Sequence, residues 1–191
     1  MPVIRKLLAH ERGDLRNHLL RMDAEDRRLR FGRFVSAESI LAYTTGIRWP
    51  QCWIVGAFED GVLRGVAELR TGGRPCADSR TAELSVTVER AYQNRGIGTR
   101  LLERALLIAR NRGFQSLFLL CLPENVKMQH IARKFGKQMS FRDGDVELRI
   151  ITPAPDALSC YTEMLDDAAG LWQSALTWPT LPATRALPLA S

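Results

Sequence analysis

The sequence predicts one α/β (α+β) domain with a mixed sheet, followed by a C-terminal extension. Strand-like and helix-like patterns alternate along residues 1–151, whereas residues 152–191 open with a Pro-containing linker and then show one helical pattern. A chain of 191 residues suits one ordinary domain with an appendage, and two full domains would be crowded. Hydrophobic residues at 46% and charged residues at 25% are typical of a folded globular protein.

The first part of the chain predicts one strand and then helices. We expect a strand at residues 3–7 and a helix at 11–22 with leucines on one side, which the acid-then-base segment 23–30 continues. Ser36 precedes an acidic first turn and is therefore expected to cap a further helix that ends near residue 43.

The middle of the chain predicts strands. They are expected at residues 52–58, 62–70 and 81–89. Asp60-Gly61 between the first two is a strong hairpin signal. The third strand alternates apolar residues with polar ones, starting at Glu83 and Leu84, so one of its faces is polar.

The remaining elements alternate between helices and strands. We expect a helix at 99–111 that stops at Gly113, a strand at 117–121, a helix at 124–135, a hairpin from 139–142 and 146–151, and a tail helix at 156–177. The tail helix has apolar residues at helical spacing, which predicts that it docks on the domain or on a second subunit, giving a possible homodimer.

Several classes of protein are disfavoured by composition. The longest wholly apolar runs, such as 105–109, are far too short to span a membrane, and the first residues carry charges where a signal peptide would be apolar. We therefore expect a cytoplasmic protein. The cysteines form no C-x-x-C pair and the three histidines complete no ligand set, so free buried thiols and no metal site are expected.

Charge is distributed unevenly. Residues 1–151 carry a net charge of +9, and residues 152–191 carry −3. A basic body suits nucleic acid, a phosphorylated cofactor or an acidic protein surface, and charge alone leaves these alternatives open.

The strongest local signal is Gln93-Asn94-Arg95-Gly96-Ile97-Gly98, between a predicted strand and a predicted helix. Glycines let the backbone approach a ligand closely, and free N–H groups at a helix start attract anions, so the segment suits a diphosphate. It lacks the third glycine of a dinucleotide fingerprint and the Gly-Lys-Thr of a nucleotide-binding loop. A tight strand-to-helix turn is the alternative.

In this context the hexapeptide resembles the Q/R-x-x-G-x-G/A signature of the GNAT superfamily of N-acetyltransferases. Downstream, residues 124–128 with 134–136 are similar to the superfamily's N-x-x-(A/M)…K-(L/F)-G segment. Upstream, 26–31 and 82–86 resemble bacterial protein-lysine acetyltransferases. The resemblance covers about residues 1–151 and implies a GNAT-like, mostly antiparallel sheet flanked by helices.

The resemblance also implies acetyl-CoA as the acyl-donor substrate. The backbones of Val86 and Val88 would bind its pantetheine arm, amides from Gln93 to Thr99 its pyrophosphate, and Asn125 its pantetheine. The residues so assigned are Val86, Val88, Gln93, Asn94, Arg95, Gly96, Ile97, Gly98, Thr99 and Asn125. As alternatives, the valines are core residues and Asn125 caps a helix after Pro123.

Glu83 matches the position of the catalytic base in the lysine-acetyltransferase relatives, and a cross-strand ion pair with an arginine is the alternative. Many members place a tyrosine, the general acid, where this chain has Ala132, and an aromatic residue where it has Lys137. No general acid is therefore identified.

The sequence thus predicts an N-acetyltransferase that acts on an amine, either a protein lysine or a small molecule. The alternative is a non-catalytic module on the same fold that senses acyl-CoA or contacts nucleic acid or a ribosome, which Ala132 favours. No Arg/Lys run exceeds two residues and no aromatic platform is interleaved, which disfavours nucleic acid.

Overall fold

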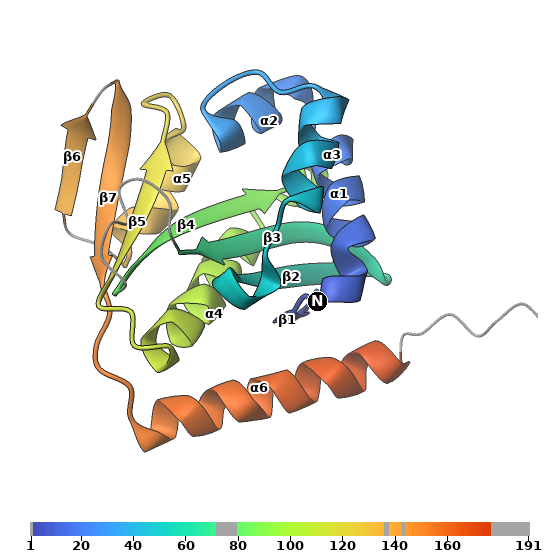
Figure 1. Ribbon diagram of the computed structural model, residues 1–191, viewed down its shortest axis with the longest axis vertical. Helices are drawn as coiled ribbons and strands as arrows, with labels where there is room; N and C mark the ends of the chain where they lie inside the picture. The colour runs from blue at the N-terminus through green and yellow to red at the C-terminus, as the bar shows by residue number, and fades with distance from the viewer. Residues whose placement is uncertain (1, 72–79, 136–137, 143, 177–191) are drawn as a thin grey trace, which may run out of the picture.

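The computed structural model describes residues 2–71, 80–135, 138–142 and 144–176. Within these ranges the chain forms a seven-stranded sheet in the order β1-β2-β3-β4-β5-β7-β6 (Figure 1). The strands are β1 (Val3–Lys6), β2 (Cys52–Glu59), β3 (Val62–Arg70), β4 (Thr81–Val88), β5 (Ser116–Cys121), β6 (Gln138–Arg142) and β7 (Asp145–Ile151). All neighbouring strands are antiparallel except β4 and β5, so the predicted mixed, mostly antiparallel sheet is confirmed.

Helices cover both faces of the sheet. They are α1 (Arg12–Arg21), α2 (Ala24–Phe31), α3 (Ala37–Thr45), α4 (Ile97–Asn111), α5 (Val126–Arg133) and α6 (Ala157–Leu176), with 3-10 turns at Ala9–Glu11, Trp49–Gln51 and Arg90–Tyr92. None of the helices in the described part of the chain is long and apolar enough to cross a membrane.

The core lies on the two sides of the sheet. On one side α4 packs a dense apolar stripe, including Leu101 and Ile108, against β2 to β5. On the other side Leu15 and Leu19 of α1 pack with α3 against β2 and β3. A smaller cluster under α5 joins β5 to β7. Both sides of the central strands are therefore buried, and the sheet fixes the positions of all helices around it.

Two turn predictions are confirmed in detail. Asp60 and Gly61 both have positive φ angles, 53° and 74°, as a type I′ hairpin turn requires. Ser36 caps α3 by accepting a hydrogen bond from the backbone N–H of Ser39.

The prediction that segment 23–30 continues the first helix is wrong. Met22 is extended, and the Asp23 side chain accepts a 2.7 Å hydrogen bond from the N–H of Asp26. An N-cap of this kind begins a new helix because it satisfies an amide that has no intrahelical acceptor. The chain therefore turns after Met22, and α2 is a separate helix beside the end of β4.

The cysteine prediction needs one correction. Cys52 and Cys121 are free and buried, and burial raises the pKa of their thiols to about 12 and about 11. Cys160, on α6, is free but exposed. The fourth cysteine, Cys76, lies outside the described residues, as does Lys137.

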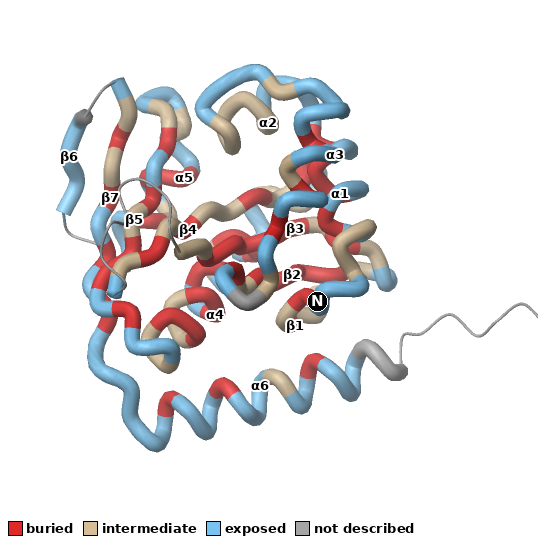
Figure 2. Tube along the Cα trace, in the orientation of Figure 1, coloured by how far each residue is buried: buried red, intermediate tan, exposed pale blue. Residues whose placement is uncertain are grey.

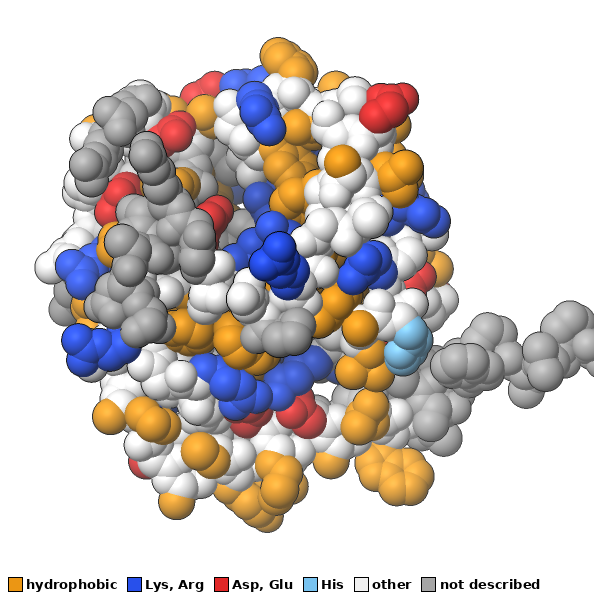
Figure 3. Space-filling view, viewed as in Figure 1, with side chains coloured by type: hydrophobic (Ala, Val, Ile, Leu, Met, Phe, Trp, Pro, Cys, Tyr) orange, Lys and Arg blue, Asp and Glu red, His pale blue; other side chains and the backbone are white. Residues whose placement is uncertain are grey.

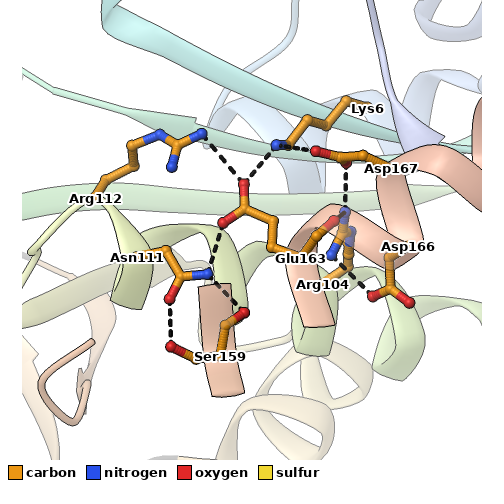
Figure 4. A network of polar contacts seen from close by, with 8 residues as sticks. All are labelled: Lys6, Arg104, Asn111, Arg112, Ser159, Glu163, Asp166 and Asp167. Carbon is orange, nitrogen blue, oxygen red and sulfur yellow. Dashed lines mark hydrogen bonds and ion pairs between the residues drawn. The ribbon is translucent and has the colours of Figure 1, made fainter. Parts of the chain in front are cut away.

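α6 docks on the domain, as one of the two predicted arrangements requires, but not through its apolar face. It runs across β1 and α4 (Figure 1 and Figure 2). Its buried side chains, Ser159 and Glu163, are polar. Glu163 accepts hydrogen bonds from Lys6 of β1 at 2.5 Å and from Asn111 of α4 at 2.7 Å. Arg104 of α4 binds Asp167 at 2.5 Å (Figure 4).

Close approach of the backbones supports this polar docking. A Cβ atom built on Gly170 would lie 2.6 Å from the Cβ atom of Arg5, so a larger residue would push α6 away from β1. The acidic tail and the basic body thus meet through specific ion pairs rather than through a general attraction.

Glu163 is expected to hold α6 in place in a pH-dependent way. Burial by itself would raise its pKa, but hydrogen bonds from Lys6 and Asn111 outweigh burial and hold the pKa below the ordinary 4.5. A lowered folded pKa stabilises the fold above the unfolded value, and this stabilisation is lost as the pH falls through the folded value. Glu163→Gln should therefore lower the free energy of unfolding at pH 7 by about 1–3 kcal/mol.

Urea unfolding of both proteins at pH 7 and at acidic pH checks this prediction, and the difference between them should shrink in acid. Asp166→Asn is the control, since Asp166 is half-exposed and its partner Arg104 keeps Asp167; it should cost less than about 1 kcal/mol. Equal urea midpoints for wild type and Glu163→Gln at pH 7 would contradict the role of Glu163.

Candidate functional site

The site begins where β4 and β5 separate. The two strands pair in parallel over three positions, ending at Glu83 and Phe118. Among the described residues no pairing between them continues beyond that point, although β4 runs on to Val88 and β5 to Cys121. The edge of β4 after Glu83 is therefore open on its β5 side, with backbone groups available to a ligand that lies along it.

A cavity of about 820 Å³ fills this opening. Its walls come from α2, the end of β4, the turn into α4, the end of β5 and α5. Of the ten residues assigned to acetyl-CoA, nine line the cavity and Arg95 does not. The side chain of Arg95 lies over the ring of Tyr92 and 3.7 Å from Glu59.

The glycine segment forms the turn that leads into α4. Asn94 and Gly96 both have positive φ, 61° and 76°, and Gly96 is the N-cap. Gly96 has no side chain that could cap the helix. The first amides of α4 therefore have neither an intrahelical acceptor nor a capping side chain at the N-cap. No acidic residue lies in the first turn of α4. This arrangement favours an anion from outside the chain.

Gly98 lies where α4 approaches α5. A Cβ atom there would lie 3.0 Å from Cδ1 of Ile131 and 3.9 Å from Cγ2 of Val88. Since all three residues line the cavity, the missing side chain leaves room on the cavity wall. The residues present thus fit a diphosphate-containing ligand.

Gln93 connects three walls of the cavity. Its Nε2 donates to the carbonyl of Val88 at 3.0 Å, and its Oε1 accepts from Lys127 of α5 at 2.7 Å. The same Nε2 lies 3.5 Å from Asp26 of α2. Lys127 and Asp26 were not identified as site residues from the sequence, because only the fold brings α2 and α5 to the end of β4.

Asn125 has a structural role. Its Oδ1 accepts a 3.1 Å hydrogen bond from the N–H of Met128 and caps α5, which begins at Val126 and not at residue 124 as expected. The capping alternative is therefore confirmed. The Nδ2 group is the part of the side chain that can still donate to a ligand.

Glu83 lies deeper in the sheet than the cavity. It is half-buried on β4, two residues before Ser85, which is the first β4 residue in the cavity wall. Its cross-strand partner is Arg70, whose guanidinium donates to Glu68 at 3.3 Å. The side chains of Glu83, Ser85 and Thr87 share one face of β4.

A buried cluster supports the cavity wall behind Thr87. Nε2 of the fully buried His18 lies 2.9 Å from Oγ1 of Thr87, and Nδ1 lies 3.3 Å from the carboxylate of Glu89. Burial lowers the pKa of His18 and outweighs the effect of Glu89, which favours the neutral ring. Because a carboxylate only accepts, Nδ1 donates to Glu89 and Nε2 accepts the Thr87 hydroxyl hydrogen. Thr87 is then left with oxygen lone pairs for a ligand.

Glu89 is unsuited to be a base. Burial would raise its pKa, but hydrogen bonds from His18, Arg21 and Arg64 outweigh burial and bring the pKa to about 2. A carboxylate this weakly basic does not take a proton near neutral pH.

The wall that α2 contributes is also fixed by an ion pair. Arg30 donates to the buried carboxylate of Glu68 and to Tyr43, both at 2.8 Å. Burial would raise the pKa of Glu68, but Arg30 and Arg70 outweigh it and keep the pKa low. Arg28 likewise pairs with Glu25 and Glu124. The charges of these two arginines of α2 are therefore balanced by carboxylates.

Ala132, a residue of α5, is fully buried and presents no polar group to the cavity. Cys121, which the sequence did not single out, does line the cavity. Within the described ranges, no group of three His, Cys, Asp or Glu residues is arranged to hold a metal ion.

Comparison with known proteins identifies the family to which this architecture belongs. The family model described as "Acetyltransferase (GNAT) family" matches residues 19–137, more than half of the chain. The Bacillus subtilis protein named "Putative phosphinothricin acetyltransferase YwnH" is 38% identical over 64 residues, which are 34% of this chain and 39% of YwnH. The match therefore spans less than half of that relative.

Solved structures share the fold. The GNAT domain of S. lividans PAT superposes with a TM-score of 0.65 at 24% identity, covering 78% of this chain and 89% of that one. The PaiA N-acetyltransferase of Thermoplasma acidophilum, in complex with coenzyme A, gives a TM-score of 0.59 at 20% identity over 79% and 99% of the two chains. The resemblance inferred from the sequence motifs is confirmed, and the chain belongs to the GNAT acetyltransferase family.

Proposed function

We propose that this protein transfers the acetyl group of acetyl-CoA to an amine, either of a small molecule or of a protein lysine. The observation that carries the proposal is the open edge of β4 ending at the glycine turn of α4, in a chain of the GNAT family. Family membership favours this function over a non-catalytic module. A cytoplasmic location stays a prediction.

Different parts of the cavity would bind different parts of the two substrates. Amides from Gln93 to Thr99 would hold the pyrophosphate, and the open backbone of Val86 and Val88 would bind the pantetheine arm. The acceptor amine would then enter beside α2, near Ser85 and Thr87, whose hydroxyls lie on the same face as Glu83.

The reaction requires an amine without its proton. The amine nitrogen forms a bond to the thioester carbonyl carbon, the carbon–sulfur bond breaks, and the proton moves to a base while the thiolate takes one up. Glu83 is our proposed base, acting through a water molecule because it lies behind Ser85. Water is the proposed acid, since Ala132 has no proton to give.

Gly98→Val tests the cofactor site. The new side chain would contact Ile131 and Val88 on the cavity wall, and the dissociation constant for acetyl-CoA should rise about tenfold or more. The fold should persist, because Gly98 is helical and its neighbour is the flexible end of Ile131. Gly96 is unsuitable for this test, since its positive φ makes any substitution strained.

Isothermal calorimetry measures this affinity, with Gly13→Val as the control. Gly13 is also helical, and a Cβ atom there meets nothing within 4 Å, so its affinity should match that of wild type. A folded Gly98→Val protein that binds acetyl-CoA normally would remove the basis for the assigned site.

Glu83→Gln tests the base. Acetyl-CoA affinity should stay unchanged, while turnover should fall by roughly 10²- to 10⁴-fold, the usual contribution of a positioned acid–base group. The loss should shrink as pH rises, because more acceptor amine is then already deprotonated. Acceptor-dependent release of the coenzyme A thiol across pH gives the rate, and a melting curve gives the folded fraction.

Glu147→Gln is the matched control, since Glu147 is a half-buried glutamate on β7 of the same sheet and does not line the cavity. It should keep full turnover. Should Glu83→Gln prove less stable but fully active per folded molecule, Glu83 is a structural partner of its neighbouring arginines.

The same release assay run with a panel of amines and lysine peptides identifies the acceptor class. If no acceptor supports thiol release in a protein that binds acetyl-CoA, the proposal of catalysis fails.

A further inference from the structure

The outer face of α6, on the side away from the domain, is exposed to solvent (Figure 2), and hydrophobic side chains lie along it (Figure 3). Six large apolar side chains are 48–74% exposed: Leu158, Tyr161, Met164, Leu165, Leu171 and Trp172. Soluble helices usually bury such a face and expose the polar one. Here the orientation is reversed, and the reversal requires an explanation.

The inner face of α6 is already occupied. Its acids pair with bases of β1 and α4, including the ion pairs of Glu163 with Lys6 and of Asp167 with Arg104 (Figure 4). Gly170 lies in close contact with β1. Rotating α6 to bury its apolar side would break these buried ion pairs. Breaking a buried ion pair costs more free energy than breaking an exposed one on an ordinary surface. The apolar face is therefore held outward.

The spacing of the exposed face favours another helix as its partner. Leu158, Tyr161, Leu165, Ala168 and Trp172 follow one another at intervals of three and four residues. This is the a/d stripe along which two helices pack side by side. Met164 and Leu171 widen the stripe on one side.

Charge favours an identical face over a lipid surface. The described part of α6 contains no Lys or Arg, and its acids are turned toward the domain. Helices that lie on membranes usually carry Lys and Arg on their polar side. Two copies of an uncharged apolar stripe meet without repulsion and are self-complementary about a twofold axis.

The exposed apolar area of α6 is also close to the area that a dimer interface buries on each partner. The six exposed side chains present roughly 700 Å², taking about 150–250 Å² for a fully exposed large side chain. A typical monomer's largest apolar patch is about 300–600 Å², while each partner in a standard interface buries about 800 Å².

We propose that α6 is the interface of a homodimer, in which two copies pack their outer faces antiparallel about a twofold axis near Leu165 and Ala168. This register places Tyr161 of one protomer beside the partner's Trp172. The inference goes beyond acetyl transfer and does not depend on it, because no described α6 residue lines the cavity.

Sedimentation velocity of the full-length chain over about 1–100 µM tests the proposal, a range in which a standard interface is largely associated. Wild type should sediment with twice the mass of one chain. Leu165→Glu/Trp172→Glu should be monomeric, with dimer affinity weakened at least about 100-fold, because it places four carboxylates in the interface. Both side chains face solvent in the protomer, so the variant should stay folded and keep its acetyl-CoA affinity.

Phe34→Glu is the matched control: Phe34 is 76% exposed but lies between α2 and α3, so this variant should remain dimeric. A wild type that is monomeric throughout the range overturns the proposal, whether or not it binds vesicles of neutral phosphatidylcholine; binding to them would assign the face to lipid. A dimer that persists unchanged in the double variant also overturns it.

Discussion

β4 and β5 pair over three positions, ending at Glu83 and Phe118, and then diverge. This short parallel pairing determines what the domain can hold. If the two strands stayed paired to their ends, the backbone of β4 would be fully used and the cavity would not exist. Their divergence leaves an edge inside a sheet, protected from other chains by α2 and α5 rather than by charge or proline.

Two buried carboxylates hold the elements on the α1 and α2 side of that edge in place. Glu89 gathers His18 and two arginines at the end of β4, and Glu68 holds Arg30 of α2. Each carboxylate would be costly to bury alone, and each is stable because several donors converge on it. The same donors make them poor bases. Neither Glu68 nor Glu89 is therefore suited to be a base, and the proposed base is a third carboxylate, Glu83.

The C-terminal helix α6 docks on the domain through its acidic face rather than its apolar one. Its apolar residues predict docking, and docking occurs, but through the acids between them. Ion pairs with Lys6 and Arg104 and the close contact at Gly170 outweigh the tendency to bury the apolar side. Which side of an amphipathic helix is buried depends on the surface against which the helix packs. β1 and α4 present basic side chains to α6, so the acidic side of α6 is buried.

By itself, the sequence determined the order of the strands, the hairpin at Asp60 and Gly61, and the glycine turn with its family resemblance. These are local signals, carried by turn chemistry, periodicity and the conformational freedom of glycine. The break before α2 was missed because helical periodicity continued across it, although the cap at Asp23 was visible in principle. The tertiary structure alone decided that Lys127 and Asp26 meet Gln93, that Glu83 lies behind the cavity and that α6 turns its apolar face outward. Each depends on which distant residues the sheet brings together, and no local pattern encodes such contacts.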